Sequence, residues 1–470
     1  MERLREFLLK YLETQYGISK VVKDCAERVL VKLEKGSICL KIENKVEVEE
    51  LKKSLAVGTK DEIRPLIFDG EDLYIQKYFV YQTRILKKIK ELLDDKKIHI
   101  ITGGPGTGKT TSLAAILKNE LEKRILLAAP TGKAALRMQE SLAKQGIKLE
   151  AKTLHRLLGY KHLSVNFKQT KDNPLEADII AIDECSMIDL PMMSKLLEAV
   201  PSNCDLYLLG DKNQLASVEA GSVFADICKK FERGHKGNEN IYKELTVNYR
   251  AKNAPGIAVL SKQILEGSVN NFNNENVNYF ENDKFESELF SWYKDLFSMQ
   301  AKNEALEFLK TFQILCATKA GKNGTKYINK KLCDIAKKEN AKFTPIIITE
   351  NNYQQNLFNG DVGVKDNEHA YFYVGENEIK AFPALTLPAH DPAFAITIHK
   401  SQGSEYERVA VVYPVRENEE EREGENETIL TKELLYTAVT RAKKECFICG
   451  AKEVLVNSCG KGIDRVSGIK

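Results

Sequence analysis

Residues 98–110 read IHIITGGPGTGKT, and this stretch decides the fold. A short apolar run of strand length leads into a glycine-rich turn, and a helical pattern begins at Thr110. Residues 103–110 match the pattern G-x-x-x-x-G-K-[ST] in full. The flanking strand and helix disfavour the alternative interpretation, a chance glycine turn.

The glycine-rich turn predicts a binding site for the phosphates of ATP. Glycines let backbone N–H groups wrap around phosphates at the N-terminus of the following helix. Lys109 is expected to reach the β- and γ-phosphates, and the Thr110 hydroxyl is expected to bind Mg²⁺. The residues that we expect to contact the nucleotide here are Gly103, Gly104, Pro105, Gly106, Thr107, Gly108, Lys109, Thr110 and Thr111.

Two further apolar runs end in polar side chains. Residues 179–184 read IIAIDE, and residues 208–214 read LLGDKNQ. Because parallel strands bring their carboxyl ends to one edge of a sheet, we expect these side chains to meet the glycine-rich turn. Asp183 would hold Mg²⁺ and Glu184 would polarise the attacking water. Gln214 would sense the γ-phosphate or position water, although a plain polar strand-to-helix turn remains an alternative there.

Apolar runs of strand length alternate with helical patterns along the chain, which predicts an α/β fold with parallel sheets and helices on both faces. The chain has 470 residues, which is too many for one core, so we expect two or three domains. Between residues 342 and 392 the pattern changes to short strands and turns. That change predicts a small antiparallel barrel inserted into the second α/β domain.

The composition is that of an ordinary globular protein, with 43% hydrophobic and 29% charged residues. The 70 basic and 67 acidic residues leave a net charge of only +3, so any nucleic-acid-binding surface must be local. No apolar run approaches the roughly 18 residues of a membrane span, and charged residues interrupt the N-terminus. We therefore expect a cytoplasmic protein without a membrane partner. Cys446 and Cys449 lie in one apolar run, where they would point to opposite faces of a strand and could not easily share a metal.

These elements, in this order, resemble those of the superfamily 1 helicases. The sequences of the individual motifs are similar to those of the RecD family of RecBCD-type recombination enzymes. The resemblance covers nearly the whole chain and is strongest from residue 98 to residue 445. Outside the elements above, the matching stretches are residues 129–135 (APTGKAA), 153–159 (TLHRLLG), 245–250 (LTVNYR), 359–363 (NGDVG), 397–405 (TIHKSQGSE) and 436–442 (YTAVTRA).

The resemblance implies two RecA-like P-loop domains with parallel sheets, a small N-terminal domain and an inserted SH3-like β-barrel. We divide the chain into residues 1–76 (N-terminal domain), 77–255 (first RecA-like domain), 256–341 with 393–470 (second RecA-like domain), and 342–392 (insert). ATP and Mg²⁺ would bind between the RecA-like domains. Single-stranded or tailed duplex DNA would bind across both of them, and RecB- or RecC-like subunits would dock on the N-terminal domain.

The resemblance also implies roles for residues outside the ATP-binding loop. Arg250 and Arg441 match arginine fingers, which act on charge that develops on the transferred phosphoryl group. Gln402, Gly403 and Glu405 would face the nucleotide. Gln82 is the only candidate for an adenine contact, but its spacing departs from the family pattern, and an ordinary surface glutamine is the equal alternative. The residues expected to contact DNA are Thr131, Lys133, His155, Thr397, His399 and Lys400; the histidines could instead be buried structural residues.

The leading interpretation is an ATP-dependent DNA helicase that moves 5′→3′ and unwinds duplexes in recombination and double-strand-break repair, alone or within a helicase–nuclease complex. An RNA helicase of the same superfamily is one alternative, and a structural subunit with a dispensable motor is another. We find no nuclease constellation, because pairs such as Asp283 and Glu286 lack a strand-end context.

Overall fold

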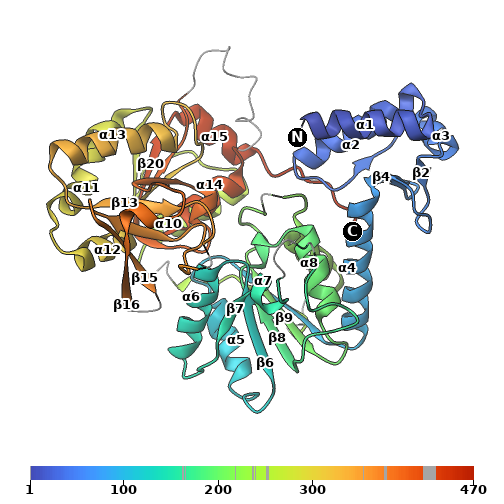
Figure 1. Ribbon diagram of the computed structural model, residues 1–470, viewed down its shortest axis with the longest axis horizontal. Coiled ribbons are helices and arrows are strands. Elements are labelled where there is room, and N and C mark those ends of the chain that lie inside the picture. The colour runs from blue at the N-terminus through green and yellow to red at the C-terminus, as the bar shows by residue number, and fades with distance from the viewer. Residues whose placement is uncertain are drawn as a thin grey trace.

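The computed structural model describes residues 2–160, 164, 166–217, 219–235, 238, 240–249, 253–352, 354–374, 378–415 and 430–469. These residues form four β-sheets, two of them parallel (Figure 1). The predicted α/β fold with two parallel-sheet domains is therefore confirmed. Among the helices of the described residues, none has both the length and the apolar character that a membrane crossing requires.

The first domain is built on a six-stranded parallel sheet. In sheet order its strands are β10 (Tyr242–Leu245), β5 (Ile98–Gly103), β9 (Asp205–Gly210), β8 (Ile179–Ile182), β6 (Ile125–Ala129) and β7 (Ala151–Thr153). One face packs on α4 (Gln76–Asp94), α8 (Leu190–Ala199) and α9 (Val223–His235), and the other on α5 (Lys109–Leu117) and α6 (Gly132–Ala143). Successive residues of a strand point to opposite faces, so the apolar run of β5 contributes Ile100 to one core and Ile101 to the other.

The second domain repeats this plan with a five-stranded parallel sheet. Its strands, in sheet order, are β11 (Val277–Glu281), β20 (Ala442–Gly450), β19 (Tyr406–Val412), β12 (Phe312–Cys316) and β18 (Ala395–Thr397). The helices α10 (Pro255–Glu266), α14 (Lys432–Val439) and α15 (Lys452–Gly460) pack on one face, and α11 (Leu289–Ser298), α12 (Lys302–Thr311) and α13 (Thr325–Lys338) pack on the other. Cys446 and Cys449 of β20 belong to the cores on opposite faces, as the alternation of a strand predicts.

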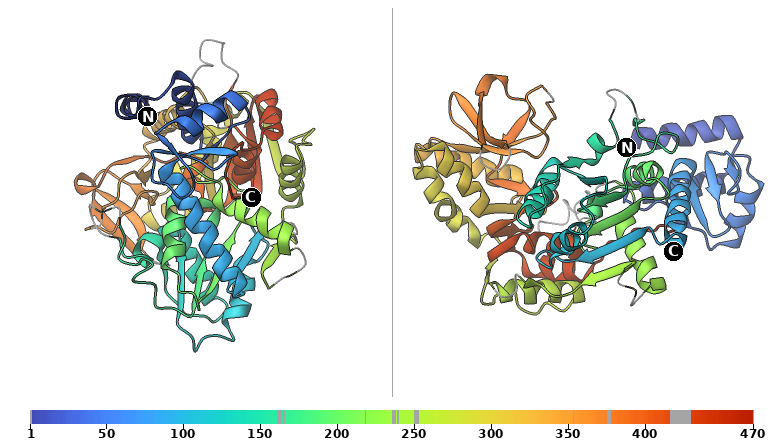
Figure 2. Two further views of the ribbon diagram at one scale, coloured as in Figure 1. Left: turned by 90° about the vertical axis from the view of Figure 1, so that its right-hand side faces the viewer. Right: turned by 90° about the horizontal axis from the view of Figure 1, so that it is seen from below.

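The insert is a five-stranded antiparallel sheet between β12 and β18. Its strands, in sheet order, are β16 (Glu378–Pro383), β15 (His369–Val374), β14 (Val362–Lys365), β13 (Thr344–Ile348) and β17 (His390–Pro392). In the described part of the chain β16 and β17 stand at the two edges of this sheet. The insert rests on α12 and projects from the body of the second domain (Figure 2).

The N-terminal domain has a small sheet and a core of its own. The sheet consists of β1 (Leu40–Lys41), β4 (Asp72–Ile75), β3 (Leu66–Phe68) and β2 (Val57–Gly58). It packs against α1 (Glu2–Tyr16), α2 (Lys20–Glu34) and α3 (Lys45–Lys53), and it lies at the N-terminal end of α4 (Figure 1).

The chain after α15 does not stay with the second domain, to which the sequence assigned it. It crosses to the first domain and ends beside α4 (Figure 1). Val466 and Ile469 join the core formed by α4, α8 and α9, and Ile469 is 5% exposed. The N–H of Ile38 in the N-terminal domain donates to the carbonyl of Val466 (2.9 Å). This C-terminal segment therefore links three parts of the molecule.

Candidate active site

The glycine-rich turn lies between β5 and α5 at the carboxyl edge of the first sheet. Gly106 and Gly108 have φ angles of +79° and +82°, a region that side chains rarely adopt. The Lys109 ammonium folds back and donates to the carbonyls of Gly103 (2.7 Å) and Gly104 (3.2 Å). A Cβ atom at Gly104 would stand 2.8 Å from the Tyr436 hydroxyl of the second domain, so a larger residue would collide across the cleft. The positive φ angles of Gly106 and Gly108, the close approach at Gly104 and the position of Lys109 all fit a loop that closes around phosphate groups.

The carboxylates of Asp183 and Glu184 follow β8 at the same edge. The Glu184 N–H donates to Asp183 Oδ1 (2.8 Å), and Glu184 has a φ of +53°, unusual for a residue with a side chain. Burial, with the charge of Glu184, raises the pKa of Asp183 to about 6, while Lys109 opposes the shift. A desolvated carboxylate of this kind is stabilised by a cation. Together with the Thr110 hydroxyl at the start of α5, Asp183 offers the oxygen donors that Mg²⁺ prefers, and Mg²⁺ takes its remaining ligands from water and phosphates.

The third strand end contributes Gln214 and a residue that the sequence analysis missed. Asp211, directly after β9, is 1% exposed and accepts from Gln214 Nε2 (3.2 Å) and the Tyr436 hydroxyl (3.0 Å). Burial raises the pKa of Asp211, whereas Lys109 and these hydrogen bonds oppose that shift. The signal was available, because Asp211 lies in the same polar run as Gln214.

Arg441 comes from the second domain and is 1% exposed. Its Nε donates to the Thr437 carbonyl (3.0 Å) and its Nη1 to the Ser404 carbonyl (3.2 Å), but its buried Nη2 has no hydrogen-bond partner among the described residues. Burial lowers the pKa of Arg441, and the charge of Glu184 leads the opposing effects. A buried guanidinium with one unused donor, electrostatically coupled to the carboxylates of the other domain, is suited to an anion that enters between them.

Direct hydrogen bonds close the cleft between the domains. The Leu215 N–H donates to Thr437 Oγ1 (2.9 Å), and the Leu215 carbonyl accepts from Gln402 Nε2 (2.9 Å). Arg137 of α6 donates to the Gly403 carbonyl (3.1 Å) and forms an ion pair with Glu405 (2.7 Å). Gln402, Gly403 and Glu405 thus contact the first domain, and their expected contact with the nucleotide stays a prediction.

Arg137 was not found from the sequence. It stands four residues after Lys133 on the same helix, and that spacing places it on the same helix face as a predicted site residue.

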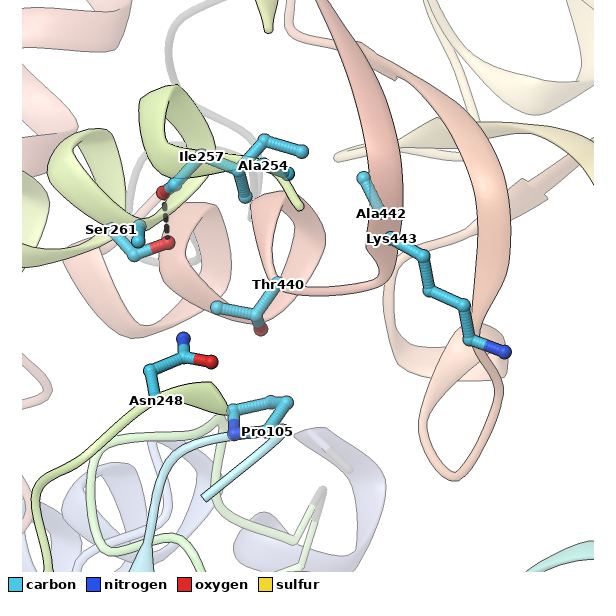
Figure 3. A pocket seen from close by; sticks show the side chains of 9 residues that line it. Pro105, Asn248, Ala254, Ile257, Ser261, Thr440, Ala442 and Lys443 are labelled. Atoms are coloured by element: carbon cyan, nitrogen blue, oxygen red, sulfur yellow. Dashed lines mark hydrogen bonds between the residues drawn. The ribbon is translucent and has the colours of Figure 1, made fainter. Parts of the chain in front are cut away.

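A small pocket lies beside the glycine-rich turn (Figure 3). Pro105 and Asn248 line it from the first domain, and Ser261, Thr440 and Lys443 are among those that line it from the second. Its volume of about 20 Å³ admits little more than one water molecule. This pocket therefore has no room for a nucleotide base.

The predicted nucleic-acid residues of the first domain lie at the starts of the helices that follow β6 and β7. Thr131 and Lys133 are at the N-terminus of α6, and His155 is in the short helix α7 (Leu154–Leu157). Thr131 caps α6, where its hydroxyl accepts from the Ala134 N–H (3.2 Å). Desolvation lowers the pKa of Lys133 to about 8, and Arg137 adds to the shift while Asp361 of the insert opposes it. The His155 ring stands edge-on to Tyr160 and Phe167, with ring centres 5.9 and 5.8 Å away.

The predicted nucleic-acid residues of the second domain gather around β18. Thr397 and Lys400 line a cavity of about 520 Å³. The cavity carries further cationic side chains on α13 and before it, together with one carboxylate: Lys319, Lys326, Lys330 and Asp391. Burial lowers the pKa of His399, and the nearby charges of Arg465 and Lys319 add to this effect. The structure thus brings Thr397 and Lys400 together in a basic cavity.

Two residues expected to contact the nucleotide, Gln82 and Arg250, are not seen at the cleft in the described structure. Gln82 is 4% exposed, and its amide binds the Gly468 N–H (2.8 Å) and the Tyr74 hydroxyl (3.4 Å), so it is neither an ordinary surface residue nor free for adenine. Arg250 lies outside the described residues. Tyr249, before it, donates its N–H to the Gly106 carbonyl (3.1 Å).

Comparisons with known proteins agree with this site. Residues 87–220 match the AAA domain family, and residues 392–449 match the UvrD-like helicase C-terminal domain. The RecBCD enzyme subunit RecD of Buchnera aphidicola subsp. Schizaphis graminum is 30% identical, and the match covers 87% of this chain and 85% of that protein. The ATP-dependent RecD2 DNA helicase of Deinococcus radiodurans is 27% identical over 77% of this chain and 48% of its own length.

Among solved structures, the Pif1 helicase from Bacteroides in complex with ADP-AlF3 and ssDNA is 17% identical, with a TM-score of 0.42 over 77% of this chain and 91% of that one. The sequence relatives decide the assignment, because 30% identity extends over most of both chains and the phosphate loop, strand-end carboxylates and buried arginine converge on one cleft. This chain therefore belongs to the RecD family of superfamily 1 helicases and is an ATP-dependent DNA helicase.

Proposed function

We propose that the protein couples ATP hydrolysis to 5′→3′ movement along single-stranded DNA, and that it unwinds duplexes in recombination and double-strand-break repair in the cytoplasm. One observation carries the coupling. Residues 397–405 contribute Thr397 and Lys400 to the basic cavity and, only a few residues later, Gln402 and Glu405 to the cleft with the first domain. A shift of this segment at one site must therefore move the other.

On this proposal the closed cleft is the catalytic arrangement. Lys109 leaves the loop carbonyls and binds the β- and γ-phosphates, and Glu184 polarises the attacking water. Thr110 and Asp183 would hold Mg²⁺, which would supply positive charge to neutralise the phosphates. Arg441 approaches from the second domain, and Arg250 is the other proposed arginine finger. Gln214 senses the γ-phosphate through its hydrogen bond with Asp211.

The nucleic-acid track crosses both domains on this proposal. Its contacts are Thr131, Lys133 and His155 in the first domain and Thr397, His399 and Lys400 in the second. The lysines would bind backbone phosphates, and the aromatic group around His155 would stack on a base. Because closure changes the distance between the two sets, repeated closure and opening would move the strand.

We assign the insert to the SH3-like domain of this family, and its proposed role is to form one wall of the channel for single-stranded DNA. It reaches the first domain at two points. The guanidinium carbon of Arg156 lies over the Phe358 ring, 5.4 Å from the centre of that ring. Asp361 interacts electrostatically with Lys133. Both contacts fall next to predicted nucleic-acid residues, so the insert stands where the separated strand would run.

The N-terminal domain is the proposed docking site for RecB- or RecC-like subunits. Support comes from the name of the Buchnera relative, a RecBCD enzyme subunit, and from apolar side chains that this domain leaves exposed, including Phe7, Leu55 and Ile63. The Deinococcus relative is named as a helicase in its own right, so the first experiment must use the chain alone.

The polarity is tested with matched duplexes that carry either a 5′ or a 3′ single-stranded tail. We expect ATP-driven unwinding only from the 5′ tail, and none with Lys109→Ala, because phosphate contacts are lost. Unwinding only from the 3′ tail would refute the proposed direction. ATPase activity that DNA stimulates without any unwinding would instead show that a partner is required.

Replacing Arg441 tests its role as an arginine finger. We expect Arg441→Ala to lower kcat of the DNA-stimulated ATPase by about 10³-fold, because the transition-state charge loses its buried donor. The affinity for ATP should change little, since the phosphate loop is intact. Lys444→Ala is the matched control, because Lys444 is exposed and pairs only with the surface residue Glu407 in the described structure. A wild-type kcat in Arg441→Ala would contradict the assignment.

Replacing Lys400 tests the basic cavity. We expect Lys400→Ala to weaken binding of a single-stranded oligonucleotide and to reduce the slope of log affinity against log salt by about 0.7, the value for one lost phosphate contact on a single strand. Fluorescence anisotropy at several salt concentrations measures both quantities. Lys452→Ala, which removes an exposed lysine of α15, should leave the slope unchanged. An unchanged slope in Lys400→Ala would remove this residue from the track.

Replacing Phe358 tests the role of the insert. We expect Phe358→Ala to reduce duplex unwinding severalfold while the ATPase stimulated by single-stranded DNA stays within twofold of wild type, because the ATP cleft lies in other parts of the molecule. Phe290→Ala, at a partly exposed phenylalanine of α11, is the control for removing an aromatic ring. Unwinding at the wild-type rate would show that the contact with Arg156 does not serve strand separation.

A further inference from the structure

The C-terminal segment, residues 461–469, crosses between the two RecA-like domains with almost no slack. On the second domain, the Lys461 carbonyl accepts from the Lys432 N–H (2.8 Å), and the Ile463 N–H donates to Glu433 (3.1 Å). On the first domain, the next fixed residue is Arg465. Asp464 alone separates the two anchors, and α14, which holds the first anchor, leads directly to Arg441.

Arg465 is bound by backbone oxygens of one loop. Its Nη1 donates to the carbonyls of Ser217 (2.7 Å), Glu219 (3.2 Å) and Gly221 (3.1 Å). A Cβ atom at Gly36 would lie 2.4 Å from Arg465 Nε, so the N-terminal domain comes into close contact with the guanidinium through a glycine. The planar fork of an arginine suits several carbonyls at once, which a lysine ammonium cannot match in the same geometry.

The loop that Arg465 binds begins in the catalytic cleft. Its first residue, Leu215, follows Gln214 and is bound by Thr437 and Gln402 of the second domain. Its far end, at Ser217, Glu219 and Gly221, is bound by Arg465. One end of the loop is therefore held by the second domain and the other by the C-terminal segment, although the loop belongs to the first domain.

Other contacts of the segment are enough to dock it. Ser467 donates to Asp226 (2.7 Å), the Gly468 N–H donates to Gln82 (2.8 Å), and Ile469 is buried in the core of the first domain. None of these three contacts touches the loop that follows Gln214. Of the contacts of the segment named here, those of Arg465 are the ones that reach this loop.

We propose that Arg465 is a positioning residue for ATP hydrolysis, which holds the far end of the loop 215–221 so that cleft closure brings Gln214 into place. The inference rests on the role proposed above for Gln214. Arg465 itself touches neither the phosphate loop nor the strand-end carboxylates in the contacts described, so it acts through the loop. Its charge also contributes to lowering the pKa of His399, which places it close to the predicted nucleic-acid track.

The test compares variants of the full chain in the ATPase assay with single-stranded DNA and in thermal unfolding. We expect Arg465→Ala to lower kcat about tenfold, because the loop that follows Gln214 loses its anchor, with KM for ATP within twofold of wild type. Arg465→Lys should recover part of kcat, because a charge remains but the fork is lost. Lys461→Ala removes an exposed lysine of the same segment and should match wild type.

Ser467→Ala separates positioning from docking, because it removes one docking bond and leaves the loop contacts in place. The proposal expects Ser467→Ala to lower the melting temperature without lowering kcat. It is overturned if kcat falls in parallel with the melting temperature in both variants, or if Arg465→Ala keeps the wild-type kcat. If DNA does not stimulate the ATPase of the wild-type chain, the proposed function is contradicted. This result comes from the wild type alone and is therefore distinct from any result with the Arg465 variants.

Discussion

The peptide groups of Leu215 find their hydrogen-bond partners on the opposite domain, and the closed cleft depends on this pairing. Leu215 is 6% exposed, so neither group can turn to water while the cleft is closed. A buried peptide group left unpaired costs about 1–3 kcal/mol, but a group that opening exposes to water loses much less. The two bonds therefore favour good alignment in the closed state without making the open state inaccessible.

In the cleft, one desolvated carboxylate and one guanidinium nitrogen are incompletely compensated. Asp183, Glu184 and Asp211 stand opposite Lys109, Arg137 and Arg441, yet Asp183 has a raised pKa and Arg441 Nη2 has no partner among the described residues. A desolvated carboxylate is relieved by a cation, and an unused guanidinium donor by an anion. MgATP brings one of each. Binding between the domains would complete both halves of the charge pattern, which gives the nucleotide a physical reason to stabilise closure.

The sequence predicted what local patterns encode. The strand, the glycines and the lysine of residues 98–110 specify a phosphate loop because each residue type is needed within thirteen positions. Cys446 and Cys449 fall on opposite faces because a strand alternates. The partner of Gln82, Gly468, lies 386 residues away along the chain, and sequence periodicity gives no sign of such a contact. Arg137 and Arg465 were missed for the same reason, since their partners lie 266 and 244–248 residues away along the chain.

These missed contacts all join the two halves of the chain. One of them, the bond from Arg137 to Gly403, holds the segment 397–405. The segment is short and internally bonded: Ser401 is fully buried, its hydroxyl donates to the Ile398 carbonyl (2.7 Å), and the Ser404 N–H donates to the Ser401 carbonyl (2.9 Å). A turn braced in this way moves as a unit. Arg137 holds its Gly403–Glu405 end, and the basic cavity holds its Thr397–Lys400 end. On the proposed function, a displacement at the nucleotide would be transmitted to the DNA through this internally bonded turn.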